Sequence, residues 1–144
     1  MALTVTIQED LILNGNDKSN THVATFTVNE LDHRVLTINN VESSVLLFDT
    51  ANAAGTVEDT NLRYLRITNL DSSDTVKLRV RNDAEEFMIQ LDAGASFLLT
   101  EDKLDADATG SEEVISLAQI NKISAVSSDA SGSLLEIYAA SFNS

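Results

Sequence analysis

The acidic segment Asp105–Glu113 has a spacing of oxygen ligands that suits a bound cation. In Asp105-Ala106-Asp107-Ala108-Thr109-Gly110 the carboxylates alternate and glycine is sixth, as in the first half of a calcium-binding loop. The bidentate glutamate expected at the twelfth position is missing, because Ser116 stands there. The segment is therefore either an incomplete calcium loop or a solvated acidic loop that blunts a sheet edge, and the second interpretation predicts no metal site.

No other set of residues has the spacing of a catalytic site. His22 and His33 lie in no metal-binding motif, and the chain has no cysteine that would complete a zinc site. There is no G-x-S-x-G nucleophile motif, and glycine is too scarce for a phosphate-binding loop. Adjacent acids such as Glu85 and Glu86 point to opposite faces of a strand. The sequence predicts a protein that is not an enzyme and needs no cofactor.

Positive charge is concentrated in one part of a very acidic chain. Five of the nine Lys and Arg residues lie between Arg63 and Arg81, although the chain has 23 acidic residues. The side chains expected on one outward face there are Tyr64, Arg66, Lys77, Arg79 and Arg81. They are either a solvated face whose cations pair with acids on neighbouring strands, or a docking patch, since Arg and Tyr are favoured at interfaces.

Val45-Leu46-Leu47-Phe48 is apolar in both phases of a strand. Such a strand needs cover on two sides, from the fold itself or from a neighbouring subunit. Leu46 and Phe48 are therefore the second pair of candidate interface residues.

The elements that would position these residues are strands. Between Leu62 and Leu91, apolar residues recur at every second position, which is the period of a half-buried strand. With the following Phe97-Leu98-Leu99, the segments predict a four-stranded antiparallel meander onto which the rest of the chain packs. Its expected buried face is formed by Leu65, Ile67, Val76, Leu78, Val80, Phe87, Ile89 and Leu91.

The remaining sequence adds further short strands and turn signals. Strands are expected at residues 3–7, 22–28 and 134–141, with a tight reversal at Asn14-Gly15 and a turn at Asn29–Asp32. One short helix is predicted near residues 111–120, after a capping box. Nine to eleven strands with at most one helix predict an all-β antiparallel sandwich or jelly roll, as a single domain over residues 1–144.

Charge and composition limit the partners. The formal net charge of −14 opposes binding to nucleic acid and to anionic membranes. No apolar run approaches the ~20 residues of a membrane helix, and the N-terminus has no basic, apolar leader. We therefore expect a soluble protein with no nucleic-acid or membrane partner.

The central strands carry a resemblance to a known group of proteins. Tyr64-Leu65-Arg66-Ile67-Thr68-Asn69-Leu70-Asp71, Val76-Lys77-Leu78-Arg79-Val80 and the run Phe87–Phe97 resemble two hairpins of small structural proteins of tailed bacteriophages, particularly marine ones. The likeness covers the middle third of the chain, with a weaker echo in the C-terminal hairpin.

The resemblance implies a β-rich virion component without a catalytic role. The leading expectation is a capsid decoration protein that binds the major capsid protein or other virion proteins and forms a homo-oligomer. It would be located in the virion, after assembly in the host cytoplasm. The alternatives are a tail- or connector-associated protein and a carbohydrate-binding module, although the chain has no Trp and only two Tyr for a sugar platform.

Overall fold

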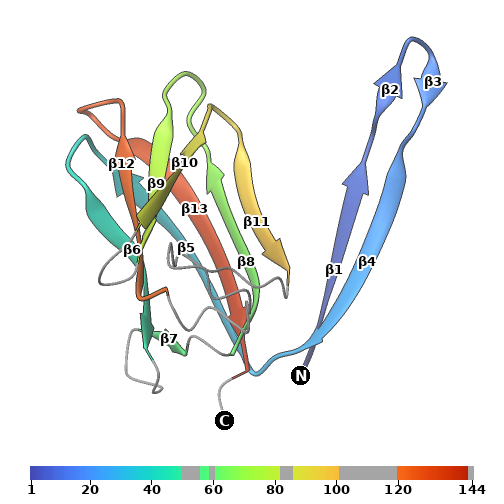
Figure 1. Ribbon diagram of the computed structural model, residues 1–144, viewed down its shortest axis with the longest axis horizontal. Helices are drawn as coiled ribbons and strands as arrows, with labels where there is room; N and C mark the ends of the chain where they lie inside the picture. Colours follow the sequence, from blue (N-terminus) through green and yellow to red (C-terminus); the bar gives the residue numbers. More distant parts are fainter. Residues whose placement is uncertain (50–55, 59–60, 82–85, 101–119, 143–144) are drawn as a thin grey trace.

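The computed structural model describes residues 1–49, 56–58, 61–81, 86–100 and 120–142, and every regular element in these parts is a strand. Two sheets pack face to face, and a long hairpin projects away from them (Figure 1). The all-β sandwich predicted from the sequence is confirmed. The helix predicted near residues 111–120 lies outside the described residues, apart from Ile120.

The larger sheet has five strands and the smaller sheet has four. The order of the larger sheet is β10 (Glu86–Leu91), β9 (Val76–Arg81), β12 (Lys122–Ser127), β6 (Ser43–Asp49) and β7 (Val57–Glu58). The order of the smaller sheet is β11 (Ser96–Thr100), β8 (Leu62–Asn69), β13 (Ser133–Ser141) and β5 (Glu30–Ile38). Neighbouring strands are antiparallel except for the short β6–β7 pair, which is parallel.

The core lies between the two sheets and follows the predicted alternation. Leu65 and Ile67 of β8 are fully buried, whereas Arg66 between them points to the outer face. In β9, Leu78 is fully buried, and Phe87 and Ile89 of β10 pack against the core from its margin. The buried face predicted for these strands is therefore confirmed.

The predicted meander is wrong, because β8 and β9 belong to different sheets. β8 pairs with β11 and β13, whereas β9 pairs with β10 and β12. The alternation of side chains says which residues are buried, but not whether consecutive strands lie beside each other or face each other across a core. Both arrangements bury the same residues, so the pattern alone does not distinguish them.

Asn69 holds the loop that carries the chain from one sheet to the other. Its side chain is fully buried, and its amide nitrogen lies 2.8 Å from the carbonyl oxygen of Asp74 and 3.2 Å from those of Leu91 and Asp92. Its carbonyl oxygen accepts a hydrogen bond from the backbone N–H of Asp71, at 3.1 Å. One side chain thus ties the β8–β9 crossing to the β10–β11 turn.

The C-terminal strand β13 lies inside the smaller sheet, between β5 and β8. It pairs with β5 from Ser133 to Ser141, and this pairing starts at Glu30. The turn predicted over Asn29–Asp32 is therefore wrong in extent, because residues 30–32 continue the strand where β13 supplies hydrogen-bond partners.

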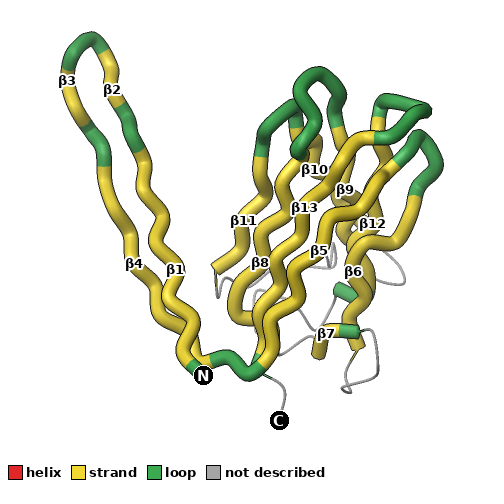
Figure 2. Tube along the Cα trace, turned by 180° about the vertical axis from the view of Figure 1, so that it is seen from behind, coloured by secondary structure: helices red, strands yellow, loops and turns green. Residues whose placement is uncertain are grey.

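Residues 1–28 form an arm that stands outside the sandwich (Figures 1 and 2). Strands β1 (Ala2–Glu9) and β4 (Asn20–Thr27) pair along their whole length, and β2 (Ile12–Leu13) and β3 (Asn16–Asp17) continue the hairpin to its tip. The reversal expected at Asn14-Gly15 is confirmed by φ angles of 52° and 78°. The expectation that the rest of the chain packs onto the central strands holds only at the base of this arm.

Replacing Asn69 with alanine should destabilise the sandwich by about 2–3 kcal/mol, because buried carbonyl groups lose their donor. The measurement is urea unfolding followed by circular dichroism. Thr68→Ala is the matched control, since Thr68 is the preceding residue of the same strand and is only partly buried; its loss should be below about 1 kcal/mol. Equal midpoints for the two variants would contradict the role given to Asn69.

Candidate functional site

The seven candidate interface residues do not form one patch. Tyr64 and Arg66 lie on the outer side of the four-stranded sheet, whereas Lys77, Arg79 and Arg81 lie on the outer side of the five-stranded sheet, on the opposite face of the molecule. Leu46 and Phe48 are in the core. The prediction of a single basic face is wrong, because the strands that carry it belong to different sheets.

Leu46 and Phe48 are covered by the fold itself. The register of β6 against β12 shifts at Val45, so Val45 is an extra residue in β6. This irregularity buries both Val45 and Leu46, each 3% exposed, and the carbonyl oxygen of Val45 accepts a hydrogen bond from Arg34 at 2.7 Å. The unusual apolar run is therefore explained by a bulge in β6 rather than by a neighbouring subunit.

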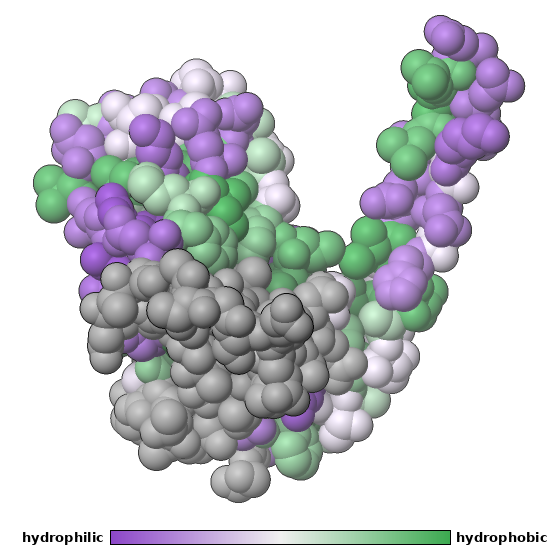
Figure 3. All heavy atoms as spheres, in the orientation of Figure 1, coloured by the Kyte–Doolittle hydropathy of each residue, from purple (hydrophilic) through white to green (hydrophobic). Residues whose placement is uncertain are grey.

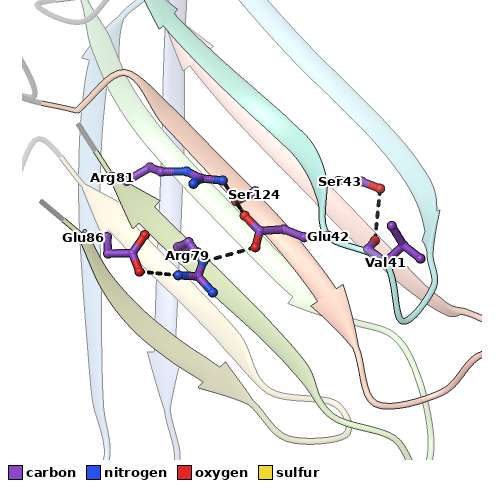
Figure 4. Close-up of polar contacts among 7 residues, drawn as sticks. All are labelled: Val41, Glu42, Ser43, Arg79, Arg81, Glu86 and Ser124. Carbon is purple, nitrogen blue, oxygen red and sulfur yellow. Dashed lines mark hydrogen bonds and ion pairs between the residues drawn. The ribbon is translucent and has the colours of Figure 1, made fainter. Parts of the chain in front are cut away.

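Two cations of the five-stranded sheet, Arg79 and Arg81, are paired with acids of the same chain (Figure 4). Glu42, in the loop before β6, pairs with Arg81 and lies 3.2 Å from Nε of Arg79, which also pairs with Glu86. The hydroxyl of Ser124 donates a hydrogen bond to the Glu42 carboxylate, and this lowers the pKa of Glu42. Burial opposes the shift, and the charges of the neighbouring cations add to it. On this face the solvated, internally paired interpretation fits better than a docking patch.

The outer face of the four-stranded sheet has a different character. Cross-strand neighbours form a row across four strands, in the order His33, Tyr138, Arg66 and Leu98. The rings of His33 and Tyr138 stack with centroids 3.9 Å apart, and the Arg66 guanidinium lies 4.7 Å from the Tyr138 centroid. Glu136 accepts from Arg66 at 2.9 Å and contacts His33 at 3.2 Å. The charge of Arg66 in this row is therefore paired with that of Glu136.

Tyr64 lies under the base of the arm. It is 9% exposed and forms an apolar cluster with Phe26 and Val28 of the arm segment and Ala140 of β13. Residues packed around the cluster are Leu3, Val5, Ala24 and Tyr138. The candidate interface residue Tyr64 thus makes a contact within the chain, and that contact fixes where the arm leaves the sheet.

The two long strands of the arm contain one charged residue, Glu9 at the end of β1. Residues 1–8 and 19–28 include no Asp, Glu, Lys or Arg, although 22% of the whole chain is charged. Neither β1 nor β4 pairs with any further strand in the described residues. Exposed sheet edges usually carry charges that prevent pairing with other chains, and depletion of charge is typical of the centre of an interface.

The tip of the arm exposes aliphatic side chains. Ile12 and Leu13 are each 71% exposed and Leu11 is 54% exposed. In Figure 3 apolar side chains lie on the side of the arm that is turned to the sandwich, at the tip as well as near the base. Sequence analysis identified these strands and the Asn14-Gly15 turn but not the arm; the absence of charge in residues 1–8 and 19–28 was the available signal.

Candidate metal ligands are not clustered in the described residues. Within them, no three His, Asp or Glu side chains are grouped so that they would hold a metal ion. His22 is on β4 of the arm, whereas His33 is on β5 of the four-stranded sheet. The segment Asp105–Glu113 lies outside the described residues. In the same described parts, no helix has the length and apolarity that a membrane crossing requires.

Comparison with known proteins gives no relative from which a role can be transferred: no protein family, curated protein or solved structure matches the chain. The candidate functional site is therefore defined by geometry alone. It consists of the arm (residues 1–28) and the outer face of the four-stranded sheet next to it.

Replacing Glu42 with glutamine should lower the free energy of unfolding by about 1 kcal/mol at pH 7, because two partly exposed arginines lose their partner. The pKa of Glu42 is lowered in the folded state, so its contribution is complete above the unfolded-state pKa and disappears as the pH falls through the folded-state pKa. Urea titrations from pH 7 down to pH 3 should therefore show wild type and variant converging. A difference that grows on acidification would contradict this assignment.

Proposed function

We propose that this chain is a non-enzymatic structural protein of a tailed-bacteriophage virion, a capsid decoration protein that attaches to the shell exterior through its arm. The observation that carries the proposal is the projecting hairpin with its exposed aliphatic tip, Leu11, Ile12 and Leu13. Exposed apolar side chains on a projecting element are uncommon in monomeric soluble domains and are typical of proteins that bind to a larger assembly. The resemblance of β8–β11 to phage structural proteins supports the same assignment.

The mechanism is passive binding. Each arm buries apolar area against the major capsid protein, and repetition of the contact over a lattice gives a large total stabilisation from individually modest contacts. The acidic sandwich faces solvent and discourages unspecific adhesion. This function requires no cofactor, and it locates the protein in the virion after assembly in the host cytoplasm.

A tail- or connector-associated role uses the same anchoring surface and differs only in the partner. A carbohydrate-binding module is less well supported, because sugars stack on free aromatic rings. Tyr64 is buried beneath the arm, and the ring of Tyr138 contacts His33 and Arg66, which come from the strands on either side of it.

The test is co-sedimentation with emptied capsids assembled from the major capsid protein encoded in the same genome. Wild-type protein should pellet with the capsids, and Ile12→Asp should weaken binding by about 10- to 100-fold, since burial of one aliphatic side chain contributes about 1.5–3 kcal/mol. Val41→Asp is the matched control, because Val41 is exposed in a loop of the sandwich.

Absence of wild-type pelleting, or equal losses in the tip and control variants, would contradict attachment to the shell through the arm. Parallel sedimentation with tail tubes separates the head from the tail assignment. Binding of the isolated protein on a glycan array would favour the carbohydrate-binding alternative.

A further inference from the structure

We propose that Asn14-Gly15, at the tip of the arm, is a site of spontaneous covalent modification, where the side-chain amide of Asn14 is converted to a carboxylate or to an isoaspartyl linkage. Both residues are exposed, and Asn14 is the one asparagine of the chain that is followed by glycine. The reactants are the chain itself and water. This inference does not depend on the virion assignment.

The reaction is an intramolecular acyl transfer. A base in the solvent takes the proton of the Gly15 N–H, and the nitrogen attacks the side-chain carbonyl carbon of Asn14. A five-membered succinimide ring closes, and the amide nitrogen of Asn14 takes up a proton and leaves as ammonia. Water then opens the ring at either carbonyl group. One opening gives aspartate, and the other gives isoaspartate, in which the main chain runs through the former side chain. One water is consumed for each ammonia released, and nothing is oxidised or reduced.

The structure leaves both reacting groups accessible. Glycine has no side chain that would screen the attacking nitrogen, and a Cβ atom built on Gly15 would meet no heavy atom within 4 Å beyond its chain neighbours. The side chains of Asn39 and Asn69 are held by hydrogen bonds from backbone N–H groups. Asn14 forms no side-chain hydrogen bond with any of the described residues, so its amide can turn towards the nitrogen.

Ring closure rotates the Asn14-Gly15 peptide out of the tight reversal that its positive φ angles define, and little opposes this opening. The strands on either side, β2 and β3, have two exposed residues each. Within the described residues they pair only with each other. Short, solvent-exposed segments of this kind open locally at low cost, whereas the same movement at Asn69 requires disruption of the core.

The isoaspartyl product changes the shape of the tip. It adds a main-chain atom to a turn that fits its strands only as two residues with positive φ. The pairing of Leu13 with Asn16 then loses its register, and the N–H of Lys18 no longer reaches the carbonyl oxygen of Leu11, now 2.7 Å away. Both products also add a negative charge to a tip that already carries Asp17.

One consequence rests on the proposed function. If the aliphatic tip is the anchor, conversion of Asn14 weakens it, because the display of Leu11, Ile12 and Leu13 changes and a charge enters the contact. Converted protein should therefore pellet less with capsids than fresh protein does. Fresh protein that does not pellet contradicts the proposed function alone, since the modification is read from mass without capsids.

Mass spectrometry of the full-length protein, stored in a neutral and in an alkaline buffer, tests the modification. Asn14 should be converted at least about tenfold faster than Asn16, into two products of equal mass that separate on chromatography. Asn16 is the matched internal control, because it is also exposed and lies on the same tip but is followed by Asp17, whose side chain screens the nitrogen. Conversion should be faster in the alkaline buffer, since the attacking nitrogen must lose its proton.

Amide hydrogen exchange measures the structural effect. In the isoaspartyl fraction the N–H of Lys18 should lose its protection, whereas the N–H of Val28, which donates to the Met1 carbonyl oxygen at the base of the arm, should keep it. The variant Asn14→Gly retains a sequence suited to the turn and, stored in parallel, should keep both protections. Conversion of Asn16 before Asn14, a rate that does not respond to pH, or isoaspartyl protein that keeps the protection of Lys18 would each overturn the proposal.

Discussion

The small apolar contact at the base of the arm fixes the direction in which the arm leaves the sandwich. Phe26 and Val28 pack on Tyr64 and Ala140, and the neighbouring backbone is fixed where the N–H of Asn29 donates to the carbonyl oxygen of Ser141 at 3.1 Å. An isolated two-stranded hairpin is marginally stable in water, so the arm depends on this contact for its direction. The arm is consequently a preoriented element rather than a free tail, and ordering it on binding costs little further entropy.

The two outer faces of the sandwich use charge in opposite ways. On the five-stranded sheet, the arginines are held by Glu42 and Glu86, and their charges are satisfied inside the chain. On the four-stranded sheet, Arg66 is paired with Glu136 in the row from His33 to Leu98, and the row lies beside an arm whose two long strands contain one charged residue, Glu9. The candidate functional site therefore lies where charge is scarce, although the concentration of positive charge was the more conspicuous feature of the sequence.

Much of the fold was predictable because side chains in a strand alternate between two faces. The burial of Leu65, Ile67 and Leu78 and the turn at Asn14-Gly15 follow from local rules. Strand partners do not, because β8 and β9 bury the same residues whether they lie side by side or face each other. The candidate site was missed for a related reason. Tyr64 and Arg66 were correctly placed on an outer face, but they would share that face with Lys77 only if β8 paired with β9. The loop held by Asn69 instead takes the chain from β8 to the other sheet.

The central place of β13 in the smaller sheet has a consequence for synthesis on the ribosome. β5 and β8 are joined only through β13, which is made after every other strand of the sandwich, so that sheet stays incomplete until residues 133–141 emerge. The arm can form before β13 is made, because its strand pairing is local. Ala140 belongs to the apolar cluster at the base of the arm and is synthesised much later. A nascent chain thus carries a hairpin with no fixed direction, and the arm is oriented only once translation has passed β13.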